Sequence, residues 1–96
     1  MSNISIIGSG SWAEALTKIL VNQKILIKCR KIKSIENKFN SNRLRLTSDF
    51  KDLTNSNIIF LAIPSQTMRE NLLKLNNLYY KNKTTFVFCS KGVEKR

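Results

Sequence analysis

A glycine-rich turn between a predicted strand and a predicted helix constrains this chain more than any other feature. Residues 8–13 read Gly-Ser-Gly-Ser-Trp-Ala, which fits the pattern G-x-G-x-x-G/A. Gly8 permits a tight turn after the strand, Gly10 lets a pyrophosphate approach the backbone, and Ala13 allows close packing of the helix. Free N–H groups and the dipole at the start of that helix favour a bound anion. The turn therefore predicts a dinucleotide site.

The hydrophobic pattern around the turn supplies the strand and the helix that such a site requires. Residues 3–7 form a β-branched run that predicts a strand ending at the first glycine. Apolar residues within 13–20 then recur at helical spacing, and we expect this helix to reach about Asn22. A second strand is predicted over residues 25–28. This order is the β-α-β unit of a parallel sheet.

The rest of the chain continues the alternation of strands and helices. Residues 31–43 are polar and lysine-rich and predict a short helix followed by a loop. Three further strands are expected, at residues 44–47, 58–63 and 84–88. Ser48 or Asp49 can cap a helical turn after the first of these strands, and a capping box at Thr67 and Glu70 predicts a helix after the second. The run 58–63 lacks alternation, which is typical of a strand covered on both faces.

This order of elements predicts an α/β fold, Rossmann-like and doubly wound, with a mainly parallel sheet. A chain of 96 residues with 42% hydrophobic residues suits one small globular domain. The chain stops at Arg96 without a closing element. We therefore expect residues 1–96 to be a dinucleotide-binding domain that is truncated at its C-terminal end, with the substrate domain absent.

Composition also excludes several other classes of protein. No apolar run approaches the roughly 20 residues of a membrane span, and no basic segment precedes an apolar run as in a secretory signal. We expect a cytoplasmic protein without membrane insertion. Cys29 and Cys89 are expected to be reduced thiols, and a chain without histidine is a poor candidate for a zinc site. No metal is expected.

The net charge of +11, from 17 Lys and Arg against six acidic residues, could mark a nucleic-acid binder. The basic residues are scattered from Lys18 to Arg96 and do not gather on one predicted helix. A spread charge is usually a solvated surface, so we expect no nucleic-acid partner and keep a basic nucleic-acid binder as an alternative. A positive field equally suits a protein whose ligands are phosphates.

The end of the second predicted strand bears on the choice of dinucleotide. NAD sites place Asp or Glu about 20 residues past the glycines, where the carboxylate holds the ribose 2′-OH. This chain reads Lys-Cys-Arg-Lys over residues 28–31 and has no acid there. Arg30 could pair with a 2′-phosphate, because its guanidinium offers both charge and a fork of donors. The segment favours NADP over NAD, and a solvated basic loop is the alternative.

Two further segments fall at the carboxyl ends of predicted strands, where a sheet of this kind presents its ligands. Residues 62–66 form a strand-to-helix turn, with Pro64 after the strand, that could run along the nicotinamide side. In residues 90–93, Lys91 could reach a phosphate or a carbonyl oxygen. Each segment taken alone is also compatible with an ordinary loop.

Three segments together resemble the bacterial NAD(P)-dependent glycerol-3-phosphate dehydrogenases. They are Ile-Gly-Ser-Gly-Ser-Trp-Ala (7–13), Leu-Ala-Ile-Pro-Ser-Gln (61–66) and Ser-Lys-Gly-Val-Glu (90–94). Trp12 distinguishes this family from other dinucleotide-binding proteins better than the glycines do. The order and spacing of the three segments also agree with the family. The resemblance covers nearly the whole chain but only about the first third of such an enzyme.

The resemblance implies reversible hydride transfer between dihydroxyacetone phosphate and NAD(P)H, which gives sn-glycerol 3-phosphate for phospholipid synthesis. By the same matching, the dinucleotide would be contacted by Ser11, Trp12, Arg30 and Lys31. Lys91 would touch both the cofactor and the phosphorylated three-carbon substrate. The family's general-base lysine and its substrate-phosphate residues lie in a helical C-terminal domain. We therefore assign no catalytic residue to this chain and expect the isolated 96 residues to be inactive.

The chain also departs from the family pattern. The family usually carries an Asn-x-Arg-Tyr-Leu-Pro-Gly loop, whereas residues 36–43 are shorter and contain no Tyr, Pro or Gly. A cofactor contact made by that tyrosine has no counterpart. Residues 13–14 are Ala-Glu in place of the more usual Gly-Thr. Two rival interpretations are a dehydrogenase of the hydroxyacid and 6-phosphogluconate type, against which Trp12 and residues 90–92 count, and a non-catalytic nucleotide-binding fragment.

Overall fold

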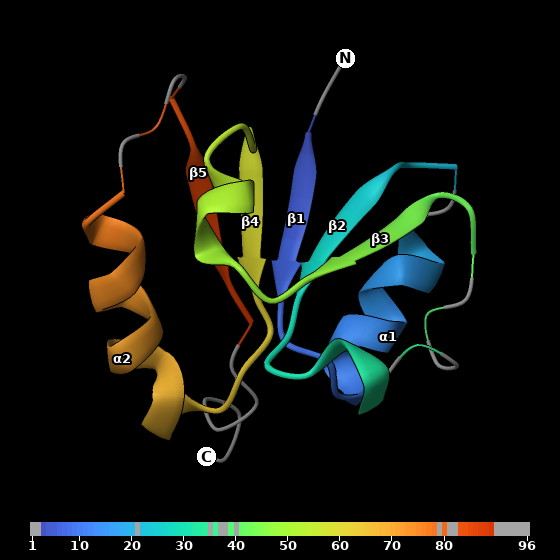
Figure 1. The fold of residues 1–96 in the computed structure, drawn as a ribbon, viewed down its shortest axis with the longest axis horizontal. Helices are drawn as coiled ribbons and strands as arrows, with labels where there is room; N and C mark the ends of the chain where they lie inside the picture. The colour runs from blue at the N-terminus through green and yellow to red at the C-terminus, as the bar shows by residue number, and fades with distance from the viewer. Residues whose placement is uncertain are drawn as a thin grey trace.

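Five short parallel strands form one sheet in the order β3-β2-β1-β4-β5 (Figure 1). The strands are β1 (Ile4–Ile7), β2 (Ile25–Lys28), β3 (Leu44–Thr47), β4 (Ile58–Leu61) and β5 (Thr85–Phe88). The computed structural model describes residues 3–20, 22–34, 36, 39, 41–78, 80 and 83–89. The chain leaves β1 toward β2 on one side, and β4 pairs with β1 on the other side. The carboxyl ends of β1 and β4 therefore meet at the point where the strand order reverses, which is where such sheets bind ligands.

Helices connect these strands and cover the sheet. In the described residues they are α1 (Ser11–Ile19), α2 (Ser65–Asn76) and the 3₁₀ helices η1 (Ile32–Ser34) and η2 (Phe50–Leu53). Figure 1 shows α1 and α2 on opposite sides of the sheet. Within this part of the chain, the structure contains no helix with the length and apolar character needed to cross a membrane.

Two apolar clusters, one on each face of the sheet, hold these layers together. The first lies under α1 and includes Ile4, Ile6, Ile25, Ile27 and Ala13. The second lies under η2 and α2 and includes Ile7, Ile59, Leu61, Leu53 and Leu75. In-register pairing places every second residue of neighbouring strands on the same face, which is why each cluster draws on several strands. Each fully buried Ile or Leu contributes roughly 1.5–3 kcal/mol relative to an exposed one.

The predicted fold class is confirmed, and the predicted strands coincide with the observed ones to within one or two residues. The strand covered on both faces is β1, whose four residues are all buried. The expectation of full cover for the run 58–63 was wrong for β4, which ends at Leu61. In β4 the side chains of Ile59 and Leu61 are buried, but those of Ile58 and Phe60 stay partly exposed on the face of α1.

The helical predictions were less accurate at their ends. The first helix ends at Ile19 and not near Asn22, because the backbone already leaves the helical conformation at Leu20 (φ −91°, ψ 52°). Asn22 then has a positive φ of 68°, which a helix does not continue through. The lysine-rich segment 31–43 forms only the short η1 in its described part, with Ile32 packed against the first cluster. So few apolar residues can bury no more than about one turn.

The capping predictions had opposite outcomes. Asp49 caps η2 as predicted, since its carboxylate accepts a hydrogen bond from the backbone N–H of Lys51 at 2.9 Å. The prediction of a capping box at Thr67 and Glu70 was wrong. The helix already begins at Ser65 with Pro64 as its N-cap, so Thr67 lies inside the first turn, where its hydroxyl donates to the carbonyl of Pro64 at 3.0 Å.

Arg43 joins the C-terminal end of α1 to the start of β3. Its guanidinium donates to the carbonyl oxygens of Thr17 (2.7 Å), Leu20 (3.2 Å) and Gln23 (3.3 Å). The last carbonyls of a helix have no partner within the helix, and a cation is favoured at that end of the dipole. One side chain therefore satisfies the Thr17 carbonyl that α1 leaves open and also binds the carbonyls of the loop that follows the helix.

We expect Arg43→Met to lower the free energy of unfolding by about 1–3 kcal/mol, because it removes charge-assisted hydrogen bonds to partly buried carbonyls. Arg45→Met is the matched control, since Arg45 lies two residues away in β3 with an exposed side chain. Urea unfolding followed by circular dichroism measures both. Equal losses in the two variants would show that the contact between Arg43 and α1 contributes nothing specific.

Candidate functional site

A pocket of about 1110 Å³ opens at the carboxyl ends of β1, β2 and β4. Its first wall consists of residues 8–12, which lead from β1 into α1, and residues 28–31, which follow β2. Its second wall consists of Phe50 of η2, residues 62–64 and one side of α2. The pocket thus lies at the point where the strand order reverses, and it is large enough for a dinucleotide-sized ligand.

Gly8 is required by the backbone itself. Its φ is +128°, a conformation that residues with a side chain rarely adopt, and a Cβ at this position would overlap the carbonyl oxygen of Ala62. Its N–H donates to the carbonyl of Lys28 at 3.0 Å. The turn therefore brings the ends of β1, β2 and β4 into close contact, and this contact forms the floor of the pocket.

Gly10 has a different role, because a Cβ there would meet open space. Gly10 is the N-cap of α1, and no side chain caps this helix. The first amide groups of α1, at Ser11 and Trp12, belong to residues that line the pocket and therefore face a surface that a ligand can approach. An anion at this position would accept hydrogen bonds from uncapped amides and interact favourably with the helix dipole. The absence of a Cβ keeps the approach open.

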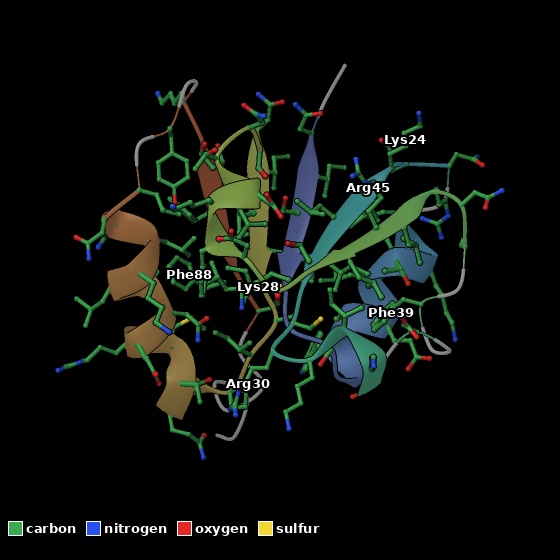
Figure 2. All side chains as sticks on the ribbon, viewed as in Figure 1. Lys24, Lys28, Arg30, Phe39, Arg45 and Phe88 are labelled. Atoms are coloured by element: carbon green, nitrogen blue, oxygen red, sulfur yellow. The ribbon has the colours of Figure 1, made fainter. Side chains whose placement is uncertain are left out.

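The structure brings most of the residues predicted for the cofactor site into this one pocket. They are Gly8, Gly10, Ser11, Trp12, Arg30, Lys31 and Pro64. Figure 2 shows Arg30 near the carboxyl ends of the strands, below Lys28. Trp12 is 42% exposed although it is a large apolar side chain, so it presents an indole surface beside the glycine turn. Lys91, predicted to contact both cofactor and substrate, lies outside the described residues.

Lys28 is a pocket residue that the sequence analysis missed. Only 8% of it is exposed, and its ammonium nitrogen lies 4.1 Å from the centroid of the Phe50 ring. This is the geometry of a cation–π contact. Desolvation lowers the pKa of Lys28, and the charges of Lys74 and Arg30 act in the same direction, while those of Cys29 and Asp49 partly oppose them.

One side of α2 is the other feature that was missed. Its pocket-lining residues are Gln66, Thr67, Glu70, Asn71 and Lys74. The sequence does contain a signal for this wall, because these polar residues recur at helical spacing and mark one face of the helix. The neighbouring face carries Met68, Leu72 and Leu75, which pack in the second apolar cluster.

The electrostatics of the pocket suit an anionic ligand. Its lining in the described part of the chain includes four cations, Lys28, Arg30, Lys31 and Lys74, and one carboxylate, Glu70. Lysine and arginine side chains at the N-terminus of a helix and the end of a strand bind and orient phosphates. The same described residues contain no group of three or more His, Cys, Asp or Glu side chains placed to hold a metal ion.

A parallel sheet of this order, with a glycine turn that leads from β1 into an uncapped helix N-terminus, defines a dinucleotide-binding domain of the Rossmann-like class. A family model described as NAD-dependent glycerol-3-phosphate dehydrogenase N-terminus matches residues 3–96. The chain therefore belongs to this family, as the three segments that resemble it had indicated.

Individual relatives agree with this assignment. The chain is 32% identical to the glycerol-3-phosphate dehydrogenase (NAD(P)+) of Neorickettsia sennetsu, in an alignment that covers 94% of this chain and 31% of that protein. It is also 32% identical to the enzyme of the same name from Halothermothrix orenii, with 96% of this chain and 31% of that protein covered. For Acholeplasma laidlawii the identity is 33%, with 95% and 31% covered. The chain thus spans about a third of the length of the curated relatives that it matches.

We expect the two glycines of the turn to differ sharply in their effect on stability. Gly8→Ala should lower the free energy of unfolding by roughly 2 kcal/mol or more, because it combines a strained φ with a backbone overlap. Gly10→Ala should cost less than about 1 kcal/mol, because its Cβ points into open space. Urea unfolding of both variants is the measurement. A Gly10→Ala protein as unstable as Gly8→Ala would contradict this division.

We expect Lys28→Met to raise the midpoint of thermal unfolding at pH 7 by roughly 2–6 °C, because it keeps the packing on Phe50 and removes a buried charge. The sign follows from the lowered pKa. The folded protein releases the Lys28 proton before the unfolded chain does, so wild-type stability rises between the lowered pKa and the ordinary value of 10.5.

The advantage of Lys28→Met should therefore shrink as the pH approaches 10.5. Lys33→Met removes a charge from an exposed position and is the control. Thermal scans at several pH values between 7 and 10.5 test this expectation. A constant difference between Lys28→Met and wild type across that range would show that the buried charge is not the cause.

Proposed function

We propose that this chain is the NAD(P)-binding domain of a glycerol-3-phosphate dehydrogenase and that it prefers NADPH. The observation that carries the proposal is the uncapped N-terminus of α1, which Gly10 leaves open toward a pocket that also contains Arg30. A dinucleotide needs an anion site for its pyrophosphate and a second site for its adenosine half. The described residues can supply both.

In this proposal the pyrophosphate lies against the turn at Gly10. The backbone N–H groups of Ser11 and Trp12 donate to its oxygens, and no side chain stands in the way. The polypeptide supplies fixed donors and a helix dipole, which need no rearrangement when the anion binds. Because Gly8 holds the turn against the end of β4, the donors have a fixed position relative to the sheet.

The preference for NADPH rests on the end of β2. Arg30 and Lys31 follow this strand where NAD sites place a carboxylate, and both are exposed to the pocket. A guanidinium can hold a 2′-phosphate through two charge-assisted hydrogen bonds, whereas it has no charge to pair with on a 2′-hydroxyl and binds it more weakly. Residues 62–64, with Pro64 at their end, would lie along the nicotinamide side of the cofactor.

The reaction proposed for the whole enzyme is reversible hydride transfer between dihydroxyacetone phosphate and sn-glycerol 3-phosphate, in the service of phospholipid synthesis. The bound cofactor would supply the hydride, and the described residues bind and orient it. Lys91 is proposed to contact both cofactor and substrate. We expect these 96 residues alone to bind nucleotide without turnover, because the resemblance places the general-base lysine of such enzymes in a helical C-terminal domain. A cytoplasmic location is part of the same proposal.

Calorimetric titration with NADPH, NADH and duplex DNA tests the proposal. We expect saturable dinucleotide binding, tighter for NADPH. Gly10→Ala should weaken both dinucleotides about tenfold or more, because its Cβ blocks the pyrophosphate. Arg30→Ala should weaken NADPH about tenfold, equivalent to about 1.4 kcal/mol, and leave NADH nearly unchanged.

Arg69→Ala provides the control for charge, because Arg69 is exposed on α2 and lies outside the pocket lining. It should bind both dinucleotides as wild type does. Salt-sensitive DNA binding without any effect of dinucleotide would sink the proposal. Equal affinity of wild type for NADPH and NADH would remove only the stated preference.

A further inference from the structure

The Phe50 ring connects cations from both walls of the pocket. The Lys28 ammonium group, from the end of β2, lies 4.1 Å from the ring centroid. The Lys74 ammonium group, from the third turn of α2, lies 5.6 Å from the same centroid. Lysines that are distant in sequence and belong to opposite walls therefore meet over one aromatic side chain.

Arg30 adds a third cation to this group. It follows Lys28 by two residues, just past the end of β2, and its side chain is exposed. All three side chains line the same pocket, and the charges of Arg30 and Lys74 both act on Lys28. Figure 2 shows Lys28 and Arg30 arranged one above the other toward the open end of the sheet.

Nearby carboxylates balance these charges only in part. Asp49 precedes Phe50, and its charge acts on Lys28 against those of Lys74 and Arg30. The same carboxylate accepts the backbone N–H of Lys51 at 2.9 Å as the cap of η2. Glu70 is the carboxylate of the described lining, and it stands among several cations. Holding like charges close together costs free energy, and an anionic ligand bound between them would recover it.

We infer that Lys74 and Lys28 form, together with Arg30, an anion site spanning both walls around Phe50, and that this site holds the 2′-phosphate of the adenosine half of NADPH. This inference rests on the proposed function and deepens it, because it assigns cofactor selection to α2 as well as to β2. A phosphomonoester carries close to two negative charges at neutral pH and offers several acceptor oxygens. One guanidinium satisfies only part of that group, whereas cations from opposite walls can surround it.

The arrangement gives the ammonium group of the buried Lys28 a use. A lysine in the interior destabilises the fold unless its charge is used, and its partners in the protein are the Phe50 ring and, at 3.5 Å, the carbonyl oxygen of Cys29. With a phosphate present, the same ammonium group gains a full counter-charge. Lys74 has an exposed and flexible stem, so it can adjust to the ligand without disturbing α2.

The decisive comparison uses adenosine 2′,5′-bisphosphate and adenosine 5′-monophosphate, which differ only in the 2′-phosphate. Calorimetry at about 0.15 M salt, where charges far from the ligand are largely screened, gives both dissociation constants for each variant. We expect wild type to bind the bisphosphate more tightly. Lys74→Gln should reduce this preference five- to tenfold and change the affinity for the monophosphate less than twofold.

Lys51→Gln is the matched control. Lys51 is exposed on η2 next to Phe50 and lies outside the pocket lining, so this variant loses the same charge without touching the site. It should keep the wild-type preference. Lys28→Met is a second test variant, and it should lose the preference while its unfolding temperature does not fall. Because Lys28→Met keeps the contact with Phe50, lost discrimination in a stable protein would not be a structural effect.

The outcomes separate this inference from the proposal beneath it. If Lys74→Gln keeps the full preference for the bisphosphate, or lowers the affinity for both nucleotides equally, the inference of an anion site formed by both walls is wrong. If Arg30→Ala alone reduces the preference, the proposed function stands and the inference fails. If wild type binds neither nucleotide, the proposed function has failed and this inference with it.

Discussion

The close approach of Gly8 to the carbonyl oxygen of Ala62 is the constraint on which the rest of this structure depends. It fixes the distance between the ends of β1 and β4, and the Gly8 amide also bonds to the end of β2. Because α1 begins three residues later, its N-terminus is aimed over the same edge of the sheet. The pocket exists where it does because three strand ends are held together by a residue without a side chain.

The pocket that results is asymmetric in its construction. Its first wall uses backbone groups, since the glycine turn and the start of α1 present amides that no side chain caps. Its second wall uses side chains of η2 and α2, among them Phe50 and Lys74. Backbone donors are fixed by the fold, whereas side chains can change with little effect on it. General affinity for a dinucleotide and the choice between related cofactors therefore reside in different parts of the molecule.

The sequence was most informative where local pattern decides the structure. The β-branched run before Gly8 and the change to helical spacing after Gly10 predicted β1, the turn and α1, and the basic end of β2 placed Arg30 and Lys31 in the pocket. Lys28 was missed because its burial depends on Phe50, which is 22 residues away in the chain and joins it only through the sheet. The wall of α2 was missed for a related reason: from the sequence alone, a polar helix face that lines a pocket has the same pattern as one that faces solvent. The predicted capping box at Thr67 was wrong because α2 begins two residues earlier, with Pro64 as its N-cap. The contact of Lys91 with cofactor and substrate stays a prediction.

Trp12 gives this site an intrinsic fluorescence signal. It is the single tryptophan of the chain, it is 42% exposed, and it lies beside the amides proposed to hold the pyrophosphate. Indole emission responds to the polarity and charge around the ring. A ligand that settles on the glycine turn must therefore change the only tryptophan emission the molecule has. The chain carries its own optical reporter in the lining of its pocket, and ligand binding can be followed without any label.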